Sequence, residues 1–205
     1  MRFILIFIIF NILSSLVISQ ENKDLIKKYD IKSGIVEYEI KGVTSGKETL
    51  YFEEWGSKTA KYTSTETNLG TNKIKNNTLT ITDKNWIYEI DLETKSGTKQ
   101  KNSESNKQQL NDRYIGEKEI KDLKGVKSVN EKLLNKDCEV WEIKKLAAKI
   151  WIYKGIILQN TTKMAGMDVS QTAVKIQENI KIPKKKFKIP KNLKITEVKN
   201  LFEDE

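Results

Sequence analysis

The sequence predicts a mainly β protein with helices, an α+β fold. We expect a strongly curved antiparallel sheet, or an unclosed β-barrel, of about nine to eleven strands with a helical lid. Three observations support this fold class. Apolar and polar residues alternate over several short segments, compact turn sequences separate these segments, and the apolar spacing becomes helical between Lys107 and Leu134. Two-residue alternation is the period of a strand with one buried face, so the sheet is the dominant element.

The first half of the chain predicts a leading helix, a meander and a hairpin. Asn22–Tyr29 has apolar residues at helical spacing among charges, which is typical of a short amphipathic helix. Leu69–Lys75 is expected to be a loop or a weak strand, and Asp83-Lys84 is the predicted hairpin turn. The predicted strands of this half are Gly34–Lys41, Lys47–Trp55, Lys58–Glu66, Thr78–Thr82 and Asn85–Glu93.

The second half predicts one or two helices and then more strands. Thr94–Asn106 is polar and is expected to be an exposed loop whose start extends the sheet. Lys107–Leu134 holds the helical pattern, interrupted near its glycines. Lys154-Gly155 is a natural two-residue turn between apolar runs. The predicted strands here are Asp137–Lys145, Lys149–Tyr153, Ile156–Met164 and Met167–Ile180.

The N-terminus predicts export. Residues 1–19 contain Arg2, a long apolar run, and small residues before Gln20, which is typical of a cleaved signal peptide. A retained membrane anchor is the competing interpretation, although the apolar run is shorter than the roughly 20 residues that span a bilayer. The remaining residues 20–205 are sufficient for a single domain. We therefore expect a soluble periplasmic protein.

The composition excludes several classes of chemistry. The chain has no histidine and one cysteine, Cys138, so a Ser-His-Asp triad, a His-ligated zinc site and an intramolecular disulfide are excluded. Cys138 lies in a predicted strand and is expected to be a small buried hydrophobe. The net charge of +9 comes from dispersed lysine rather than an arginine-rich patch, so no nucleic-acid partner is expected. We expect no catalytic residue, no metal and no cofactor.

Two surface features have competing interpretations. Glu37 and Glu39 share one strand face with Glu53 and Glu54 nearby, so a carboxylate-based hydrolase is conceivable, but outward solvated residues are what the alternation predicts. Lysines from Lys181 to Lys194 alternate with apolar residues. This segment is either a solvated tail with a few anchoring side chains or a surface that contacts anionic lipid.

Three segments resemble the LolA-like superfamily of periplasmic proteins, and within it an uncharacterised branch of exported bacterial proteins. They are GKETLYFEEWGSKTAKY at residues 46–62, KDCEVWEI followed by IWIYKGIIL within residues 136–158, and KIPKKKFKIP at residues 181–190. The resemblance implies an unclosed antiparallel barrel capped by helices, with an apolar cavity that holds acyl chains. The lipoprotein carrier itself is one member of this superfamily.

From these observations we expect a non-enzymatic, monomeric protein that binds a lipid, an acyl chain or another hydrophobic small molecule between the sheet and its helices. An envelope protein or a membrane surface is a further candidate partner. The leading alternative is a structural or interaction module of the envelope with a filled core, because strand aromatics are usually core residues. The predicted cavity walls are Tyr38, Phe52, Trp86, Tyr88, Trp141, Ile150, Ile152 and Leu158.

Overall fold

The computed structural model describes residues 27–69, 72–102, 120–164 and 167–198, and within them nearly all regular structure is β. The strands are β1 Gly34–Lys41, β2 Thr44–Glu53, β3 Lys58–Leu69, β4 Asn72–Thr82, β5 Trp86–Asp91, β6 Ser96–Lys101, β7 Val126–Lys127, β8 Glu131–Leu133, β9 Lys136–Ile143, β10 Ala148–Tyr153, β11 Ile156–Met164, β12 Met167–Glu178 and β13 Lys194–Glu197. Three 3-10 turns, η1 Glu54–Gly56, η3 Lys144–Leu146 and η4 Lys184–Phe187, connect some of them, and residues 120–122 are helical.

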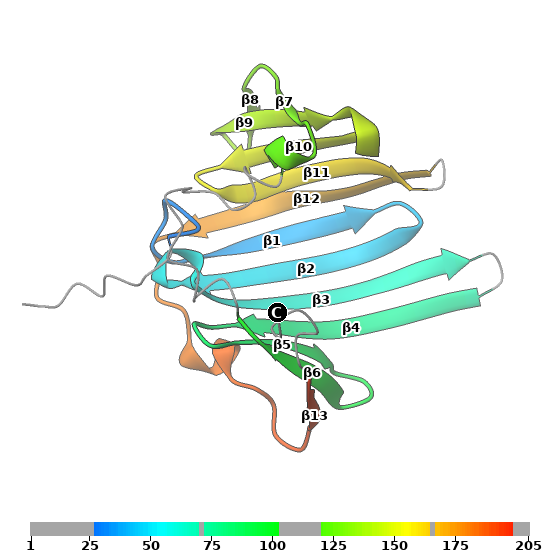
Figure 1. Cartoon of the computed structure of the whole chain (residues 1–205), viewed down its shortest axis with the longest axis vertical. Coiled ribbons are helices and arrows are strands. Elements are labelled where there is room, and N and C mark those ends of the chain that lie inside the picture. The colour runs from blue at the N-terminus through cyan, green and yellow to red at the C-terminus, as the bar shows by residue number, and fades with distance from the viewer. Residues whose placement is uncertain (1–26, 70–71, 103–119, 165–166, 199–205) are drawn as a thin grey trace, which may run out of the picture.

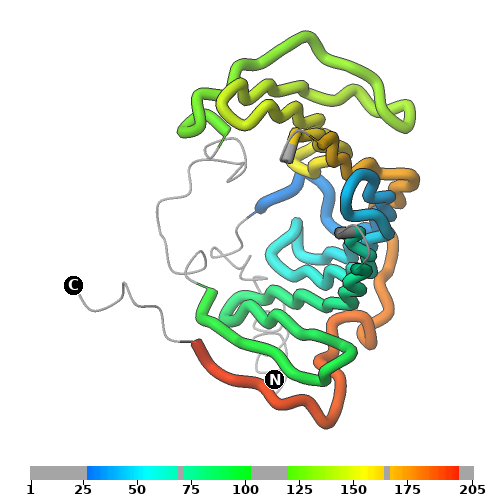
Figure 2. The backbone as a smooth tube through the Cα atoms, turned by 90° about the vertical axis from the view of Figure 1, so that its right-hand side faces the viewer, coloured from blue at the N-terminus to red at the C-terminus, as the bar shows by residue number. Residues whose placement is uncertain are grey.

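The described strands form one open sheet (Figure 1). Its order is β13-β6-β5-β4-β3-β2-β1-β12-β11-β10-β9-β7, with β8 pairing separately to β9. Every pair is antiparallel except β13 with β6, which is parallel. β1 pairs with β12 at the centre of the sheet, and this pair joins the two halves of the sheet. Figure 2 shows this layer bent strongly about a hollow side, with the helical turn at 120–122 on that side.

The predicted fold class was wrong in its helical part. The described residues form an almost entirely β structure without a helical lid. In Lys107–Leu134 the structure describes residues from 120 onward, and there only 120–122 are helical before β7 and β8 pair with β9. Lys124 adopts a positive φ of 59°, which ends the helical turn. Most of the predicted helix Asn22–Tyr29, and all of the predicted signal peptide, lie outside the described residues.

The strand predictions were largely confirmed, including the unclosed sheet. β1 and β11 have the predicted bounds, and β4 and β5 form a hairpin about Asp83-Lys84. Asp83 Oδ1 accepts hydrogen bonds from the backbone N–H groups of Asn85 and Trp86, at 2.8 and 2.9 Å, which fixes that turn. The sheet has 13 strands rather than nine to eleven because polar and short segments such as β6 and β13 also pair.

The apolar side chains gather in three clusters on different parts of the sheet. Tyr51, Ala60, Ile81 and Tyr88 are register partners from β2 to β5, so they share one face. The first cluster contains Ile31, Val36, Tyr38, Phe52, Cys138, Val140, Trp151, Ile156, Leu158 and Ala173. The second contains Ala60, Leu79, Ile81 and Ile90, with the tyrosines of that face packed against it. The third contains Ile120, Trp141, Ile143 and Ile152, with Ala148 and Ile150 against it.

Candidate ligand-binding face

The eight predicted cavity walls do not line one common cavity, because they belong to different clusters. Tyr38, Phe52 and Leu158 lie in the first cluster, and Tyr88 packs against the second. Trp141, Ile150 and Ile152 come together in the third cluster. Trp86 belongs to none of the three, and its ring centroid lies 4.2 Å from Lys99 Nζ. The first and third clusters therefore each bring together three of the predicted residues, and in the third cluster these come from the paired strands β9 and β10.

The third cluster occupies one face of β9, β10 and β11. Trp141 pairs with Ile150 across β9 and β10, and Ile152 pairs with Ile157 across β10 and β11. Paired residues project to the same side of a sheet, so these four side chains form a continuous apolar surface. Ile120, from the helical turn that overlies β10 in Figure 1, packs on it. Val140 and Trp151, the strand neighbours of Trp141 and Ile152, belong to the first cluster, so the third cluster lies on the opposite face of β9 and β10 from the first.

A groove opens where this face meets η3, and we call it the lysine groove. Its volume is about 610 Å³, within the range of roughly 300–1,000 Å³ typical of ligand pockets. Leu146 is 46 % exposed and Ile157 is 38 % exposed, so part of its apolar floor meets solvent. The groove is lined by Lys144, Lys145, Leu146, Ala147, Ala148, Ile150, Ile157, Asn160, Thr161, Thr162 and Lys163.

The local sequence explains why the groove forms. Ala147 adopts a left-handed conformation with φ 45°, which ends the 3-10 turn and directs the chain into β10. Thr162 Oγ1 on β11 donates a hydrogen bond to the Leu146 carbonyl oxygen at 2.9 Å. This bond fixes the turn against β11 across the start of β10. As a result, Leu146 and Ile157 line the same groove, although they are well separated along the chain.

A second hollow lies at the opposite ends of these strands, and we call it the acidic hollow. It has a volume of about 280 Å³ and is lined by Asp30, Asn130, Asp137, Glu139, Trp141, Ile152, Tyr153, Lys154 and Gly155. Lys154 and Gly155 have φ values of 49° and 81°, as the predicted tight hairpin turn requires. The same apolar face thus ends in a lysine-rich groove on one side and a carboxylate-rich hollow on the other.

The acidic side chains proposed as alternative catalytic groups lie elsewhere. Glu37 pairs with Lys175 at 3.3 Å and Glu39 pairs with Lys41 at 3.0 Å. The side chains of these glutamates are 44 % and 43 % exposed, so these are surface ion pairs that contribute little to stability. None of the proposed glutamates lines the lysine groove or the acidic hollow.

Glu48 is a buried carboxylate that was not predicted from the sequence. It is 8 % exposed and accepts hydrogen bonds from Thr63 Oγ1 at 2.8 Å and Gln171 Nε2 at 2.7 Å. Gln171 in turn accepts one from Asn160 Nδ2 at 2.9 Å. These side chains form a polar chain across β3, β2, β12 and β11 that compensates for burial of the charge. The sequence signal was Glu48 at the same phase of its strand as Leu50 and Phe52.

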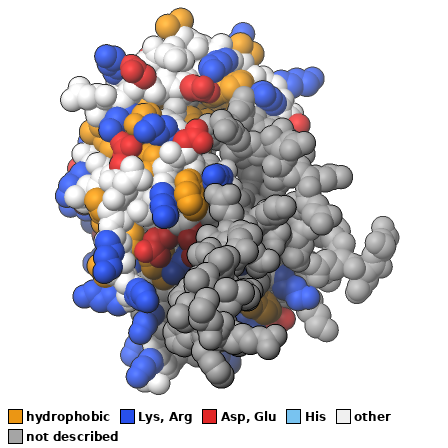
Figure 3. Space-filling view, turned by 90° about the vertical axis from the view of Figure 1, so that its left-hand side faces the viewer, with side chains coloured by type: hydrophobic (Ala, Val, Ile, Leu, Met, Phe, Trp, Pro, Cys, Tyr) orange, Lys and Arg blue, Asp and Glu red, His pale blue; other side chains and the backbone are white. Residues whose placement is uncertain are grey.

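Other expected features can be located in the structure. Cys138 is fully buried, and burial raises the pKa of its thiol, in agreement with its predicted role as a small hydrophobe. Across the described ranges, no helix is long and apolar enough to cross a bilayer. In the same ranges, no group of three or more His, Cys, Asp or Glu side chains is placed to hold a metal ion. Lysine side chains are scattered over the surface in Figure 3.

Comparison with known proteins supports the fold and leaves the family open. No protein-family model matches the chain, and no curated protein matches it. The crystal structure of an uncharacterized conserved protein from Thermus thermophilus aligns over 88 % of this chain and 99 % of its own, at 9 % identity and a TM-score of 0.52. That likeness shows a shared fold, the open and mostly antiparallel sheet.

Two further solved structures are more distant. PNGF-II aligns over 83 % of this chain and 32 % of its own, at 12 % identity and a TM-score of 0.43. A "putative outer membrane lipoprotein-sorting protein domain" from Vibrio parahaemolyticus aligns over 76 % of this chain and 89 % of its own, at 11 % identity and a TM-score of 0.29. TM-scores below 0.5 do not establish a shared fold.

Proposed function

We propose that this chain is an exported, non-enzymatic protein of the LolA-like type that binds an apolar ligand, such as an acyl chain, in the lysine groove. It acts in the periplasm as a monomer. The observation that carries the proposal is the solvent-facing apolar floor of Leu146 and Ile157, continuous with the buried third cluster. Exposed apolar residues that adjoin a core within a concavity are typical of a ligand site.

The energetics favour a chain-like ligand. Burial of apolar surface contributes about 25 cal/mol per Å², or about 0.8 kcal/mol for each methylene group. A ligand with one ring or a few methylenes therefore gains too little to offset the entropy lost on binding. A chain of about ten methylenes gains at most about 8 kcal/mol before that entropy cost is subtracted, so a long chain is required for measurable binding. We expect affinity to rise with chain length until the groove is filled.

Displacement of a neutral fluorescent probe tests the proposal. N-phenyl-1-naphthylamine should fluoresce on binding the purified protein, and 1-dodecanol should displace it more effectively than 1-hexanol. Ile157→Gln and Leu146→Gln should each weaken dodecanol binding about fivefold to tenfold, because each removes apolar floor. Val174→Gln is the matched control, since Val174 is 48 % exposed and does not line the groove.

Absence of a displaceable signal would contradict the proposal and favour the structural or interaction module. Equal losses of dodecanol affinity in Val174→Gln and in the two groove variants would also contradict the proposal. Binding would then not depend on the groove.

A further inference from the structure

We propose that the lysine groove selects an anionic amphiphile, specifically one molecule of a long-chain carboxylate whose head group lies among Lys144, Lys145 and Lys163. This inference rests on the proposed function, because it names the class of ligand that the same groove binds. Its basis is the charge of the lining residues rather than their apolar area alone. Among the described residues that line the groove, the three lysines are the only charged ones, and none is acidic.

The lysines of the groove are available for a ligand. Within the described part of the chain, Lys144 and Lys145 have no ion-pair partner, and both are exposed. Lys163 lies 3.9 Å from Asp168, but the two side chains are 64 % and 86 % exposed, so solvent screens this pair. By contrast, Lys149 at the start of β10 is engaged by Glu131 at 2.7 Å. The groove therefore retains positive charge that an anionic head group can neutralise.

The charge distribution along the face also gives the ligand a direction. The hollow at the other end of the strands contains Asp30, Asp137 and Glu139. Glu139 is paired with Lys127 at 3.1 Å and Asp137 approaches Lys132 at 3.9 Å, so these lysines are already engaged by the carboxylates of the hollow. Lys154, which also lines the hollow, is paired with Glu178, so the hollow offers an anionic head little free positive charge, whereas the lysine groove attracts it. The alkyl chain then lies along the apolar floor of the groove.

A single amphiphile fits this geometry better than a membrane surface. A bilayer presents many anionic heads in a plane, and proteins bind it through a broad basic patch. Here three lysines surround one concavity, while the lysines seen in Figure 3 are scattered among acidic and neutral side chains. We therefore assign the groove to a monomeric carboxylate, and vesicle binding becomes one outcome of the test.

Three amphiphiles of equal chain length test the selectivity. Dodecanoate, 1-dodecanol and dodecyltrimethylammonium are compared as competitors of N-phenyl-1-naphthylamine, below their micellar concentrations, at about 50 and about 500 mM salt. Dodecanoate should bind about tenfold to thirtyfold more tightly than dodecanol at low salt, because several partly screened charge contacts add to the same apolar gain. High salt should remove most of this preference, and the ammonium compound should bind most weakly.

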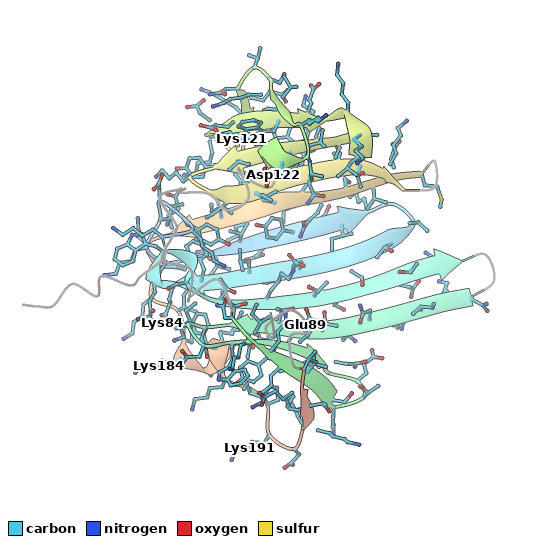
Figure 4. All side chains as sticks on the ribbon, viewed as in Figure 1. Lys84, Glu89, Lys121, Asp122, Lys184 and Lys191 are labelled. Atoms are coloured by element: carbon cyan, nitrogen blue, oxygen red, sulfur yellow. The ribbon has the colours of Figure 1, made fainter. Side chains whose placement is uncertain are left out.

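Lysine substitutions test whether the preference for dodecanoate arises in the lysine groove. Replacing Lys144, Lys145 and Lys163 together by Gln should lower dodecanoate affinity to that of dodecanol, and replacing them together by Arg should retain the preference. Lys84→Gln, Lys184→Gln and Lys191→Gln combined give a control of identical net charge. In Figure 4 these lysines lie in the other half of the molecule, away from β9–β11. Circular dichroism and thermal unfolding establish that each variant is folded.

The outcomes separate the inference from the proposed function. Displacement by dodecanol and dodecanoate with equal affinity would overturn the anion selectivity and leave apolar binding intact. Failure of all three amphiphiles would contradict both. Equal losses in the groove triple variant and the control triple variant would overturn the assignment to the groove. Cosedimentation with phosphatidylglycerol vesicles, without displacement by monomeric dodecanoate, would overturn the single-molecule ligand in favour of a membrane surface.

Discussion

The two halves of the sheet differ in how far other parts of the chain cover their apolar faces. On β3–β6, the C-terminal segment covers the second cluster, with Phe187, Leu193 and Ile195 packed against it. On β9–β11, Ile150 of the third cluster is partly exposed, and Ile157, which pairs with Ile152, is 38 % exposed beside the lysine groove. One apolar face is completed by the chain's own tail, while the other keeps open space at both strand ends. This difference is the reason why we propose a ligand site on the β9–β11 half.

The tail is fixed to the sheet by polar as well as apolar contacts. Tyr62 donates a hydrogen bond from its hydroxyl to the Lys186 carbonyl oxygen at 2.9 Å. Lys186 Nζ lies 4.6 Å from the centroid of the Tyr51 ring, and Lys58 Nζ lies 4.5 Å from that of Phe187. A hydrogen bond with Tyr51 is the main cause that raises the pKa of Lys186. The predicted solvated tail is therefore, in large part, a cover for the sheet.

The difference between the two halves is tested most directly by replacing one apolar residue in each half and measuring stability. Leu79→Ala should lower the free energy of unfolding by about 2–5 kcal/mol, because Leu79 is 1 % exposed and its truncation leaves a cavity. Ile157→Gln should change it by less than about 1 kcal/mol, because Ile157 already meets solvent. Urea unfolding measures both. Similar losses for the two variants would mean that the β9–β11 face is ordinary core.

A smaller effect is expected from uncovering the β3–β6 face. Phe187→Ala should cost about 1–3 kcal/mol of unfolding free energy, because Phe187 is partly buried against the second cluster. It should also raise the number of bound N-phenyl-1-naphthylamine molecules per chain, since an apolar face becomes accessible. Ile189→Ala in the same tail is the control, because Ile189 is 38 % exposed. An unchanged probe stoichiometry would show that the tail is not what closes this half.

The sequence was sufficient to predict strands with strict alternation, but not that the described residues contain no helical lid. β1 and β11 were predicted with the observed bounds, because β1 has one apolar face and β11 follows an unambiguous turn. In the described part of the predicted helical segment, from residue 120 on, the prediction failed because short edge strands and turns can place apolar residues at helical spacing by chance. Val126 and Val129 fitted the helical pattern, yet they are 60 % and 80 % exposed. Here pairing to β9 determined the structure, and a periodicity pattern does not contain that information.

Of the eight residues predicted as cavity walls, Ile150 lines the lysine groove, and Trp141 and Ile152 line the acidic hollow. Trp141, Ile150 and Ile152 were named together because they lie in consecutive apolar strands, and the structure does group them. The lysine groove was not predicted, because it depends on the contact between the η3 turn and Thr162. A sequence pattern shows which residues alternate, but not which turn folds back across a neighbouring strand. A pair of lysines just before an alternating apolar strand is the signal that was overlooked.

The smallest expected effect concerns the end of β12 that is linked to the β9–β11 half. Glu178 lies 2.5 Å from Lys136 and 3.4 Å from Lys154, which connects β12 to β9 and to the β10–β11 turn. Burial raises the pKa of Glu178, but the hydrogen bonds and charges of these lysines outweigh it and hold that pKa below its ordinary value of 4.5. The ion pair therefore contributes stability above pH 4.5, and this contribution is lost as the pH falls through the lowered pKa.

Glu178→Gln should consequently cost about 1 kcal/mol of unfolding free energy at about pH 7 and less at about pH 3, because the wild-type carboxylate becomes protonated as the pH falls through its lowered pKa. Urea unfolding at the two pH values gives the difference. Glu139→Gln is the matched control on β9, since its pair with Lys127 is about half exposed on both sides and should contribute less than about 0.5 kcal/mol. A Glu178→Gln loss that is independent of pH would mean that packing, rather than charge, joins β12 to the β9–β11 half.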